Sequence, residues 1–283
     1  MTPSTIAIGA VALVVVIVLV IVGIEVTGGS SSSTGALTAP KPTPASAKVV
    51  SEVESVPASV QSAVGAWSAV GVPVASELTS PTVKTGQPPL KLGKSPLPAA
   101  LYIGGVFCPY CAATRWSLLL AFSKFGTFSG LQETTSSPWD VYPDTPTFDF
   151  SKATYSSTYI NFQPVELYGQ DINAVNTHKQ VAKLTSTEAS VYQKYDSSSG
   201  VPFVDIGNKV LITGAPIYPQ LLDGKTQGQV AAQLSNPKSS VTKAIVGTAN
   251  ALIAGICNID GQKPAAVCSN SGVRAAGSAI GLS

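Results

Sequence analysis

The sequence predicts an α/β fold in which strands and helices alternate around a pair of cysteines. The short apolar run PAALYIGGVF (residues 98–107) is suited to a buried strand, and residues 109–122 repeat apolar side chains at helical intervals. Further along, residues 203–206 and 209–213 read as two short strands joined by the two-residue turn Gly207-Asn208, which is typical of a β-hairpin. These segments together predict a buried strand followed by a helix that starts at the cysteines, and a later β-hairpin.

The N-terminus predicts a membrane anchor. The run Ile6–Ile24 carries no charge, and as a helix it would span roughly 29 Å, which matches the hydrocarbon core of a bilayer. A cleaved signal peptide is the alternative, but no Lys or Arg precedes the run and no small-x-small cleavage site follows promptly. We therefore expect an uncleaved transmembrane helix within residues 1–26. Cations are absent just after it, which favours a single-pass protein in the cell membrane with its C-terminal part outside the cytoplasm.

The rest of the chain divides by composition. Residues 27–48 are rich in Gly and Ser and then in Pro, so they predict a flexible linker. Residues 49–96 form an N-terminal extension, partly helical and interrupted at Pro57. The main domain is expected at 97–283 and ends with an apolar helix over 241–257, which is too short to span a membrane and contains Lys243.

Charge argues against a polynucleotide partner. Charged residues make up 11% of the chain and the formal net charge is +2, so the sequence contains neither a basic stripe nor an acidic tail. We expect no nucleic-acid binding.

The four cysteines form a close pair and a wider pair. Cys257 and Cys268 enclose a turn-rich segment, and we expect them to form a structural disulfide. A zinc site is the alternative for all four, but zinc needs four converging ligands. The wider pair has the wrong spacing for a zinc knuckle, and the one histidine, His178, is expected on a solvated helix surface. We therefore expect no metal and no cofactor.

The close pair predicts redox chemistry. Cys108 precedes Pro109, a residue that suits the first turn of a helix. Cys108 would then lie where backbone amides and the helix dipole stabilise a thiolate, and Cys111 would lie one turn inside the helix. An exposed thiolate that attacks and a buried thiol that resolves the mixed disulfide are the requirements of thiol–disulfide exchange. Arg115 follows closely and would lower the pKa of Cys108 if it turned back toward the sulfur, whereas Trp116 is expected in the core.

The CPYC centre and the Val201-Pro202 step before the hairpin resemble the thioredoxin superfamily, and the Pro-Tyr dipeptide resembles that of glutaredoxins. The gap between these two elements is longer than in a minimal thioredoxin, as in DsbA-like proteins, and implies an insert at about 134–198. The insert contains an aromatic-rich segment, TFDFSKATYSSTYINFQPVEL, expected to be β, and a stretch at 171–195 expected to be helical. With the late cysteine pair, these features are similar to a membrane-anchored thioredoxin-like family of unknown function found in archaea and actinobacteria.

The resemblance implies roles for individual residues. Cys108 would attack and Cys111 would resolve. Pro202, if cis, would leave the backbone of Val201 free to pair with an extended substrate, and Tyr110 would shape the surface beside the thiolate. The buried acidic residue that assists proton transfer in many thioredoxins is not identifiable from the sequence.

The function expected from these features is thiol–disulfide exchange with exported proteins, of the oxidase or isomerase type, by a membrane-tethered enzyme with an unidentified redox partner. The alternative is a non-catalytic thioredoxin-like module that binds or scaffolds a partner and keeps its disulfides as structural crosslinks.

Overall fold

The computed structural model describes residues 39–70, 78–172, 178–198 and 200–282. The predicted transmembrane helix and most of the predicted linker lie outside the described residues.

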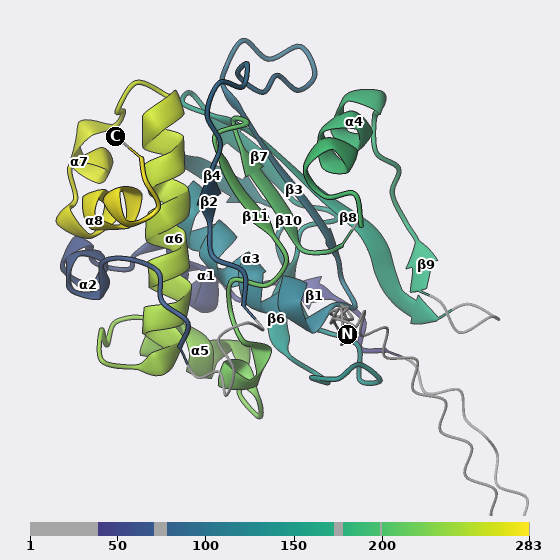
Figure 1. Cartoon of the computed structure of the whole chain (residues 1–283). Helices are drawn as coiled ribbons and strands as arrows, with labels where there is room; N and C mark the ends of the chain where they lie inside the picture. Colours follow the sequence, from purple (N-terminus) through teal and green to yellow (C-terminus); the bar gives the residue numbers. More distant parts are fainter. Residues whose placement is uncertain (1–38, 71–77, 173–177, 199, 283) are drawn as a thin grey trace, which may run out of the picture. The chain divides into compact units, whose positions relative to one another are not determined.

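A six-stranded mixed sheet forms the centre of the fold (Figure 1), with the strand order β2-β11-β10-β3-β8-β9. Strand β3 runs parallel to β8 and antiparallel to β10, and β10 and β11 form a hairpin. The strand bounds are β2 Thr82–Val83, β3 Ala99–Gly105, β8 Asn161–Ile172, β9 His178–Gln180, β10 Phe203–Ile206 and β11 Val210–Thr213. The predicted α/β class, the buried strand before the cysteines and the hairpin are confirmed.

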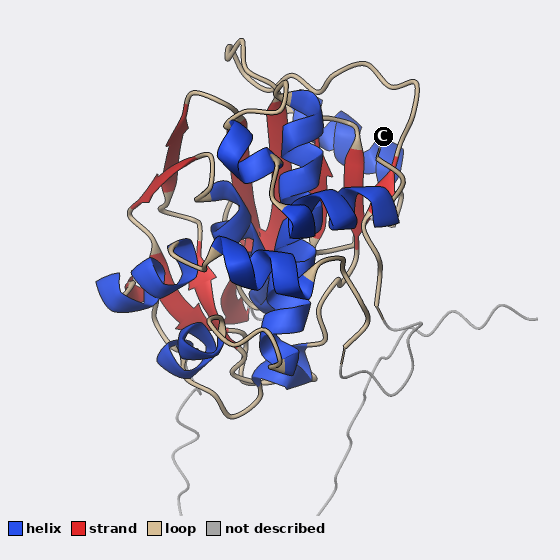
Figure 2. Ribbon diagram, turned by 90° about the vertical axis from the view of Figure 1, so that its left-hand side faces the viewer, coloured by secondary structure: helices blue, strands red, loops and turns tan. Residues whose placement is uncertain are grey.

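Helices cover both faces of the sheet, which explains why every residue of β3 is buried and why that strand reads as a continuous apolar run. Helices α3 (Pro109–Phe122) and α6 (Ser240–Ile259) pack together on one face, and Ser117 Oγ on α3 donates a 2.7 Å hydrogen bond to the carbonyl oxygen of Ile245 on α6. Helix α4 (Ser186–Tyr195) lies on the other face, where Tyr192 packs edge-on against Phe203 of β10. Figure 1 shows α6 and α4 on opposite sides of the strands, and Figure 2, seen from the left-hand side of Figure 1, shows helices in front of the strands.

The apolar helix expected near the C-terminus is α6. Among the described residues it is the one helix whose length and apolarity would allow it to cross a membrane, and 89% of its most apolar window is buried inside the fold. Its end is connected to the next short helix, α7 (Ala265–Cys268), by the predicted disulfide between Cys257 and Cys268, with a Cα–Cα distance of 5.6 Å.

The N-terminal extension is part of the folded unit. Helices α1 (Ala47–Glu54) and α2 (Ala58–Val64) are interrupted at Pro57, as predicted, and Pro57 is the N-cap residue of α2. Their apolar faces enter the main core through a set of buried valines, Val49, Val53, Val56 and Val60. Helix α1 contacts α3 and α5 (Gln227–Gln233), and α2 contacts α6 and α8 (Ser271–Ala279).

Part of the predicted linker is also structured. Strand β1 (Thr43–Pro44) pairs antiparallel with β5 (Gln132–Thr135), and α1 begins at Ala47. The prediction that the linker runs to residue 48 is therefore wrong at its C-terminal end. The prolines indicated a segment without hydrogen-bond partners, but β1 pairs with β5, the central strand of the small sheet β1-β5-β6, which is far away in the sequence.

The boundaries of the predicted insert at 134–198 need correction. That range includes β8, the parallel partner of β3, so a large part of it belongs to the central sheet. The strands added outside the central sheet, β4 to β7, lie between α3 and β8 in the chain. They form two small sheets, β4-β7 and, together with β1 from the N-terminal region, β1-β5-β6. Their further bounds are β4 Gly126–Ser129, β6 Pro146–Asp149 and β7 Thr154–Ser157.

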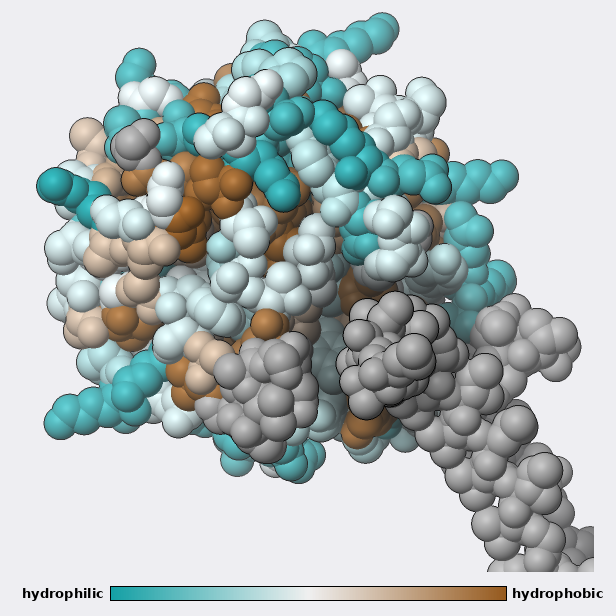
Figure 3. All heavy atoms as spheres, viewed as in Figure 1, coloured by the Kyte–Doolittle hydropathy of each residue, from teal (hydrophilic) through white to brown (hydrophobic). Residues whose placement is uncertain are grey.

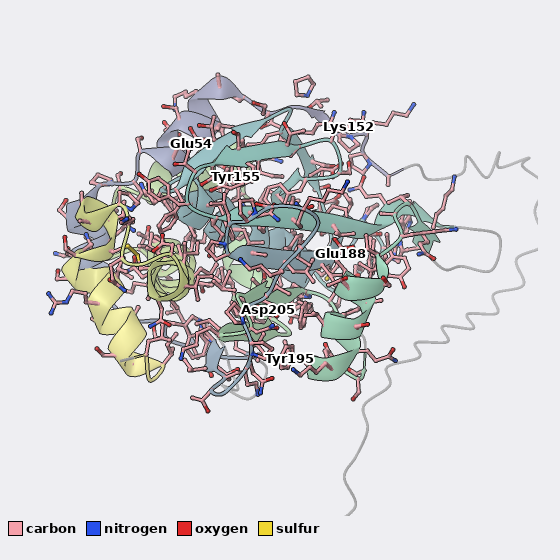
Figure 4. The ribbon with its side chains drawn as sticks, turned by 90° about the horizontal axis from the view of Figure 1, so that it is seen from above. Glu54, Lys152, Tyr155, Glu188, Tyr195 and Asp205 are labelled. Atoms are coloured by element: carbon pink, nitrogen blue, oxygen red, sulfur yellow. A yellow bond between two sulfur atoms is a disulfide. The ribbon has the colours of Figure 1, made fainter. Side chains whose placement is uncertain are left out.

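The aromatic spacing of this region is explained by a cluster beneath α3. The rings of Phe122 on α3 and Phe162 on β8 stack with centroids 3.7 Å apart. Tyr155 on β7 donates a 2.9 Å hydrogen bond to the carbonyl oxygen of Phe122, and its place at the edge of the added strands is visible in Figure 4. The aromatic residues thus pack the added strands against the central sheet. The prediction that the aromatic-rich segment forms β structure is confirmed.

The helical prediction for 171–195 is correct only for its last part. Helix α4 begins after Thr185, whose side chain and Glu188 form a reciprocal capping box. Before it, His178 lies in strand β9 at the edge of the sheet, paired with β8, and residues 173–177 lie outside the described residues. Pairing with the free edge of β8 outweighs the local helical pattern here.

Candidate functional site

Cys108 is the N-cap residue of α3. Its Sγ accepts a 3.3 Å hydrogen bond from the backbone amide of Cys111, and Pro109 occupies the first helical position. The tight turn after β3 delivers the chain to this point, because the amide of Cys108 donates to the carbonyl oxygen of Gly105 at 3.1 Å. The predicted placement of the cysteine at a helix start is confirmed.

The two thiols differ in acidity. Burial raises the pKa of Cys108, but the hydrogen bonds from the side chain and amide of Cys111, together with the charge of Arg115, outweigh burial and lower the pKa below its usual value. Burial and the hydrogen bond to Cys108 hold the pKa of Cys111 well above its usual value. Both are free thiols in the structure, 5% and 0% exposed. Cys108 is therefore the more acidic sulfur of the pair and Cys111 the less acidic one.

The Val201-Pro202 peptide bond is cis and lies against the first of these sulfurs. Cys108 Sγ is 3.8 Å from the carbonyl oxygen of Val201, across a sequence separation of 93 residues. The structure thus brings together Cys108, Cys111, Val201 and Pro202. Tyr110, the fifth predicted site residue, packs edge-on against Tyr142 of the added region, with ring centroids 5.7 Å apart.

A buried ion pair lies next to the cysteines and was not predicted from the sequence. Arg115 lies one helical turn after Cys111 and donates from Nε and Nη2 to the two carboxylate oxygens of Glu166 on β8, at 2.7 and 2.8 Å. Nη2 also donates to the carbonyl oxygen of Gly105 at 2.6 Å. Arg115 therefore does not turn outward toward solvent, yet its charge lowers the pKa of both cysteines. An arginine in an apolar helix and a glutamate in an apolar strand were the available signals.

Two further polar atoms are buried beside this pair. Among the residues that the structure describes, Nη1 of Arg115 and the hydroxyl of Tyr102 have no hydrogen-bond partner, and burial raises the pKa of Tyr102 well above its usual value. Burial also raises the pKa of Glu166, against the opposing charge and hydrogen bonds of Arg115. Glu166 is also among the residues that line an open cavity of about 650 Å³, although its side chain has no exposed surface.

A loop from the added region lies beside the cysteines. The amide of Ser137 donates a 2.8 Å hydrogen bond to the carbonyl oxygen of Phe107, the residue before Cys108. His178 stacks on the Phe107 ring with centroids 3.6 Å apart, so it is half-buried near the site and not on a solvated helix surface as predicted. Burial lowers the pKa of His178, and Asp140 of the loop opposes this.

Within the part of the chain that the structure describes, no group of three or more His, Cys, Asp or Glu side chains is arranged to hold a metal ion.

Comparison with known proteins gives one match. No curated protein and no solved structure matches the chain. One family, described as Domain of unknown function (DUF929), matches residues 88–258, which span the cysteine pair, the parallel strands, the cis peptide bond and most of α6. Because this match covers more than half of the chain, the protein belongs to the DUF929 family.

Proposed function

We propose that this protein is a thiol–disulfide oxidoreductase with a thioredoxin-like fold, tethered to the membrane and acting on exported proteins. The observation that carries the proposal is the position of Cys108. Its sulfur lies at a helix N-terminus, has a lowered pKa, and contacts the carbonyl oxygen before a cis-proline. Neither a core cysteine nor an ordinary crosslink requires this combination.

The order of the elements supports the thioredoxin-like assignment. A strand leads into the CxxC helix, a parallel strand and α4 follow, and the cis-proline then precedes an antiparallel hairpin and the helix α6. In the sheet these strands stand in the order β11-β10-β3-β8, with the cysteines at the C-terminal end of the central strand β3.

The reaction exchanges sulfur–sulfur bonds. In the oxidising direction, a substrate thiolate attacks the Cys108–Cys111 disulfide at Cys108, the bond between the two cysteines breaks, and Cys111 leaves as a thiolate that takes up a proton. A second substrate thiolate then attacks the substrate sulfur of the mixed disulfide, and Cys108 leaves as a thiolate. The substrate is oxidised by two electrons and the CPYC pair is reduced by two, so a separate oxidant of the disulfide or quinone class must restore it.

The charges around the sulfurs suit these steps. The lowered pKa of Cys108 makes it a good leaving group in the last step. Arg115 provides a fixed cation near Cys111 while that sulfur carries charge, since its charge lowers the Cys111 pKa against the effect of burial.

Export and tethering rest on the uncharged segment Ile6–Ile24 and on the Cys257–Cys268 disulfide, a crosslink typical of oxidising compartments. An oxidising or isomerising direction follows from that setting. Protease added to intact cells should therefore degrade the C-terminal domain, whereas protection from protease would place the domain inside.

The decisive experiment titrates the detergent-solubilised full chain against glutathione buffers and counts alkylated thiols by mass, with Cys108→Ser as the control. We expect Cys108 and Cys111 alone to be reduced, at a potential above about −270 mV, while Cys257 and Cys268 stay oxidised. If both pairs stay oxidised until the buffer potential falls below about −300 mV, the CPYC bond is structural and the non-catalytic binding module becomes the better explanation.

A further inference from the structure

The segment 137–142, hereafter the 137–142 loop, presents apolar side chains to solvent beside the reactive sulfur. Large apolar side chains that are exposed among the described residues are Trp139 at 40%, Val141 at 67% and Val181 at 53%. Two of these three lie in the loop. Figure 3 shows one face of the molecule, on which hydrophilic side chains alternate with smaller apolar areas.

The loop is anchored directly to the redox centre. Ser137 binds the backbone of Phe107, and Tyr142 packs against Tyr110 of the CPYC sequence and against Tyr218, which precedes the short 3-10 helix η2 (Pro219–Leu222). The hydroxyl of Tyr142 also donates a 3.1 Å hydrogen bond to that of Tyr218.

Hydrogen bonds within the loop fix its shape. Ser136 and Thr145 pair across its base, where the amide of Ser136 donates to the carbonyl oxygen of Thr145 at 2.9 Å. Inside the loop, the amide of Val141 donates to the Asp140 carboxylate at 2.6 Å, and Ser136 Oγ donates to the carbonyl oxygen of Tyr142 at 3.1 Å. A loop that is already ordered loses little conformational entropy when a ligand binds to it.

Charge restricts what can bind there. The Asp140 carboxylate is close enough to Cys108 to raise the pKa of that thiol, against the larger lowering effects, and it also acts on His178. An acidic residue in a substrate would meet Asp140 beside the sulfur, whereas a Lys or Arg would be attracted to it.

We infer that the 137–142 loop is the specificity element of the enzyme, and that it selects extended, unfolded polypeptide segments whose cysteine is flanked by apolar and cationic side chains. This inference rests on the proposed function. While the substrate is held to Cys108 as a mixed disulfide, its backbone lies along Val201 and its neighbouring side chains cover Trp139 and Val141. Folded proteins bury such side chains, so the loop favours chains that have not yet folded.

The test measures the rates of disulfide exchange between the full chain and four peptides, each with one cysteine. In two peptides Leu and Phe flank the cysteine, in the other two Ser does, and each kind is made once with a neighbouring Lys and once with a neighbouring Glu. The double variant Trp139→Ala/Val141→Ser should reduce the preference for the apolar peptides about tenfold. Asp140→Asn should remove a roughly threefold preference for Lys over Glu, and 0.5 M salt should weaken that preference in the wild type. Val181→Ser is the matched control, since it removes an equally exposed apolar side chain elsewhere and should change neither preference.

Binding without chemistry separates this inference from the proposed function. The same peptides with Ser in place of Cys are titrated against the protein, and affinity is measured by calorimetry. If the apolar peptides bind most tightly but the protein shows no exchange activity, the proposed oxidoreductase function is refuted and the loop remains a binding surface. Exchange that proceeds with equal rates for all peptides, or a Val181→Ser variant that loses as much preference as the loop variant, would overturn the inference.

Discussion

Arg115 and Glu166 are joined by two hydrogen bonds of 2.7 and 2.8 Å, and neither side chain has any exposed surface. Both are held by backbone elements that meet at the cysteine pair, since Arg115 is on the helix that contains Cys111 and Glu166 is aligned with Gly104 of β3. The pair therefore links the stability of the core to the acidity of the cysteines.

Removing one partner of this pair should be costly. Arg115→Met leaves the Glu166 carboxylate buried without its cation, and we expect the free energy of unfolding to fall by about 3 to 5 kcal/mol. The double variant Arg115→Met/Glu166→Leu should regain most of that loss because no charge remains buried. Guanidinium denaturation of the three proteins measures both effects, and equal stabilities of single and double variants would contradict the expectation.

The thiols of the reduced protein should react in sequence as pH rises. Because the pKa of Cys108 is lowered and that of Cys111 is raised, iodoacetamide should label Cys108 with a midpoint below the usual 8.5 or so, while Cys111 stays unlabelled. In Arg115→Met/Glu166→Leu the Cys108 midpoint should move upward, since a nearby cation is gone. Labelling followed by peptide mass analysis reports each site separately, and simultaneous labelling would disprove the asymmetry.

The position of the cysteine pair could be predicted from the sequence better than the residues around it, because the signals for the pair are local. Pro109 and the apolar repeat after it lie within a few residues of Cys108, so the helix start could be predicted. Glu166, by contrast, occupies a strand whose central place depends on pairing with β3, some sixty residues earlier. Whether a charged residue in such a strand faces solvent or an arginine is set by long-range register, which no local pattern contains. His178 was misplaced for the same reason.

Asp205 should make stability depend on pH. It lies on β10, on the face toward α4 (Figure 4), and burial raises its pKa to about 7, against a hydrogen bond from the Asn208 amide and the charge of Lys194. Between about pH 4 and pH 7 the folded protein keeps a proton that the unfolded chain has released, so this contribution to stability is lost as pH rises through that window.

The neutral variant Asp205→Asn should therefore match the wild type most closely at about pH 4 or below and exceed its stability by about 1 to 3 kcal/mol at pH 8. Denaturation curves at the two pH values measure the difference. A stability difference that does not change with pH would show that Asp205 does not titrate in this range.

The Cys257–Cys268 bond should stabilise the fold without affecting exchange. It closes a loop with a sequence separation of 11, so replacing both cysteines by Ala should lower the free energy of unfolding by about 3 kcal/mol. Iodoacetamide labelling of Cys108 should keep its pH midpoint. A shifted midpoint would indicate that the two cysteine pairs are coupled.

Gly272 is closely packed, so a substitution there should also lower the stability of the fold. A Cβ there would overlap the Gln61 carbonyl group, because α8 passes directly against α2. Gly272→Ala should destabilise the protein by about 2 kcal/mol or more. Gly228→Ala, in α5 with only Thr226 Oγ1 nearby at 3.9 Å, should instead raise the melting temperature slightly. Similar losses in both variants would argue against the packing explanation.

The two cysteine pairs lie at opposite ends of strand β10. Val201, next to Cys108, precedes the strand, whereas Ile259, two residues after Cys257, sits at the Gly207 turn that follows it. Six residues of extended chain separate the two points, a span on the order of 20 Å. If the CPYC pair exchanges disulfides as proposed, a folded molecule cannot reach its own Cys257–Cys268 bond, and a folded chain that still lacked this bond would depend on a second copy to form it.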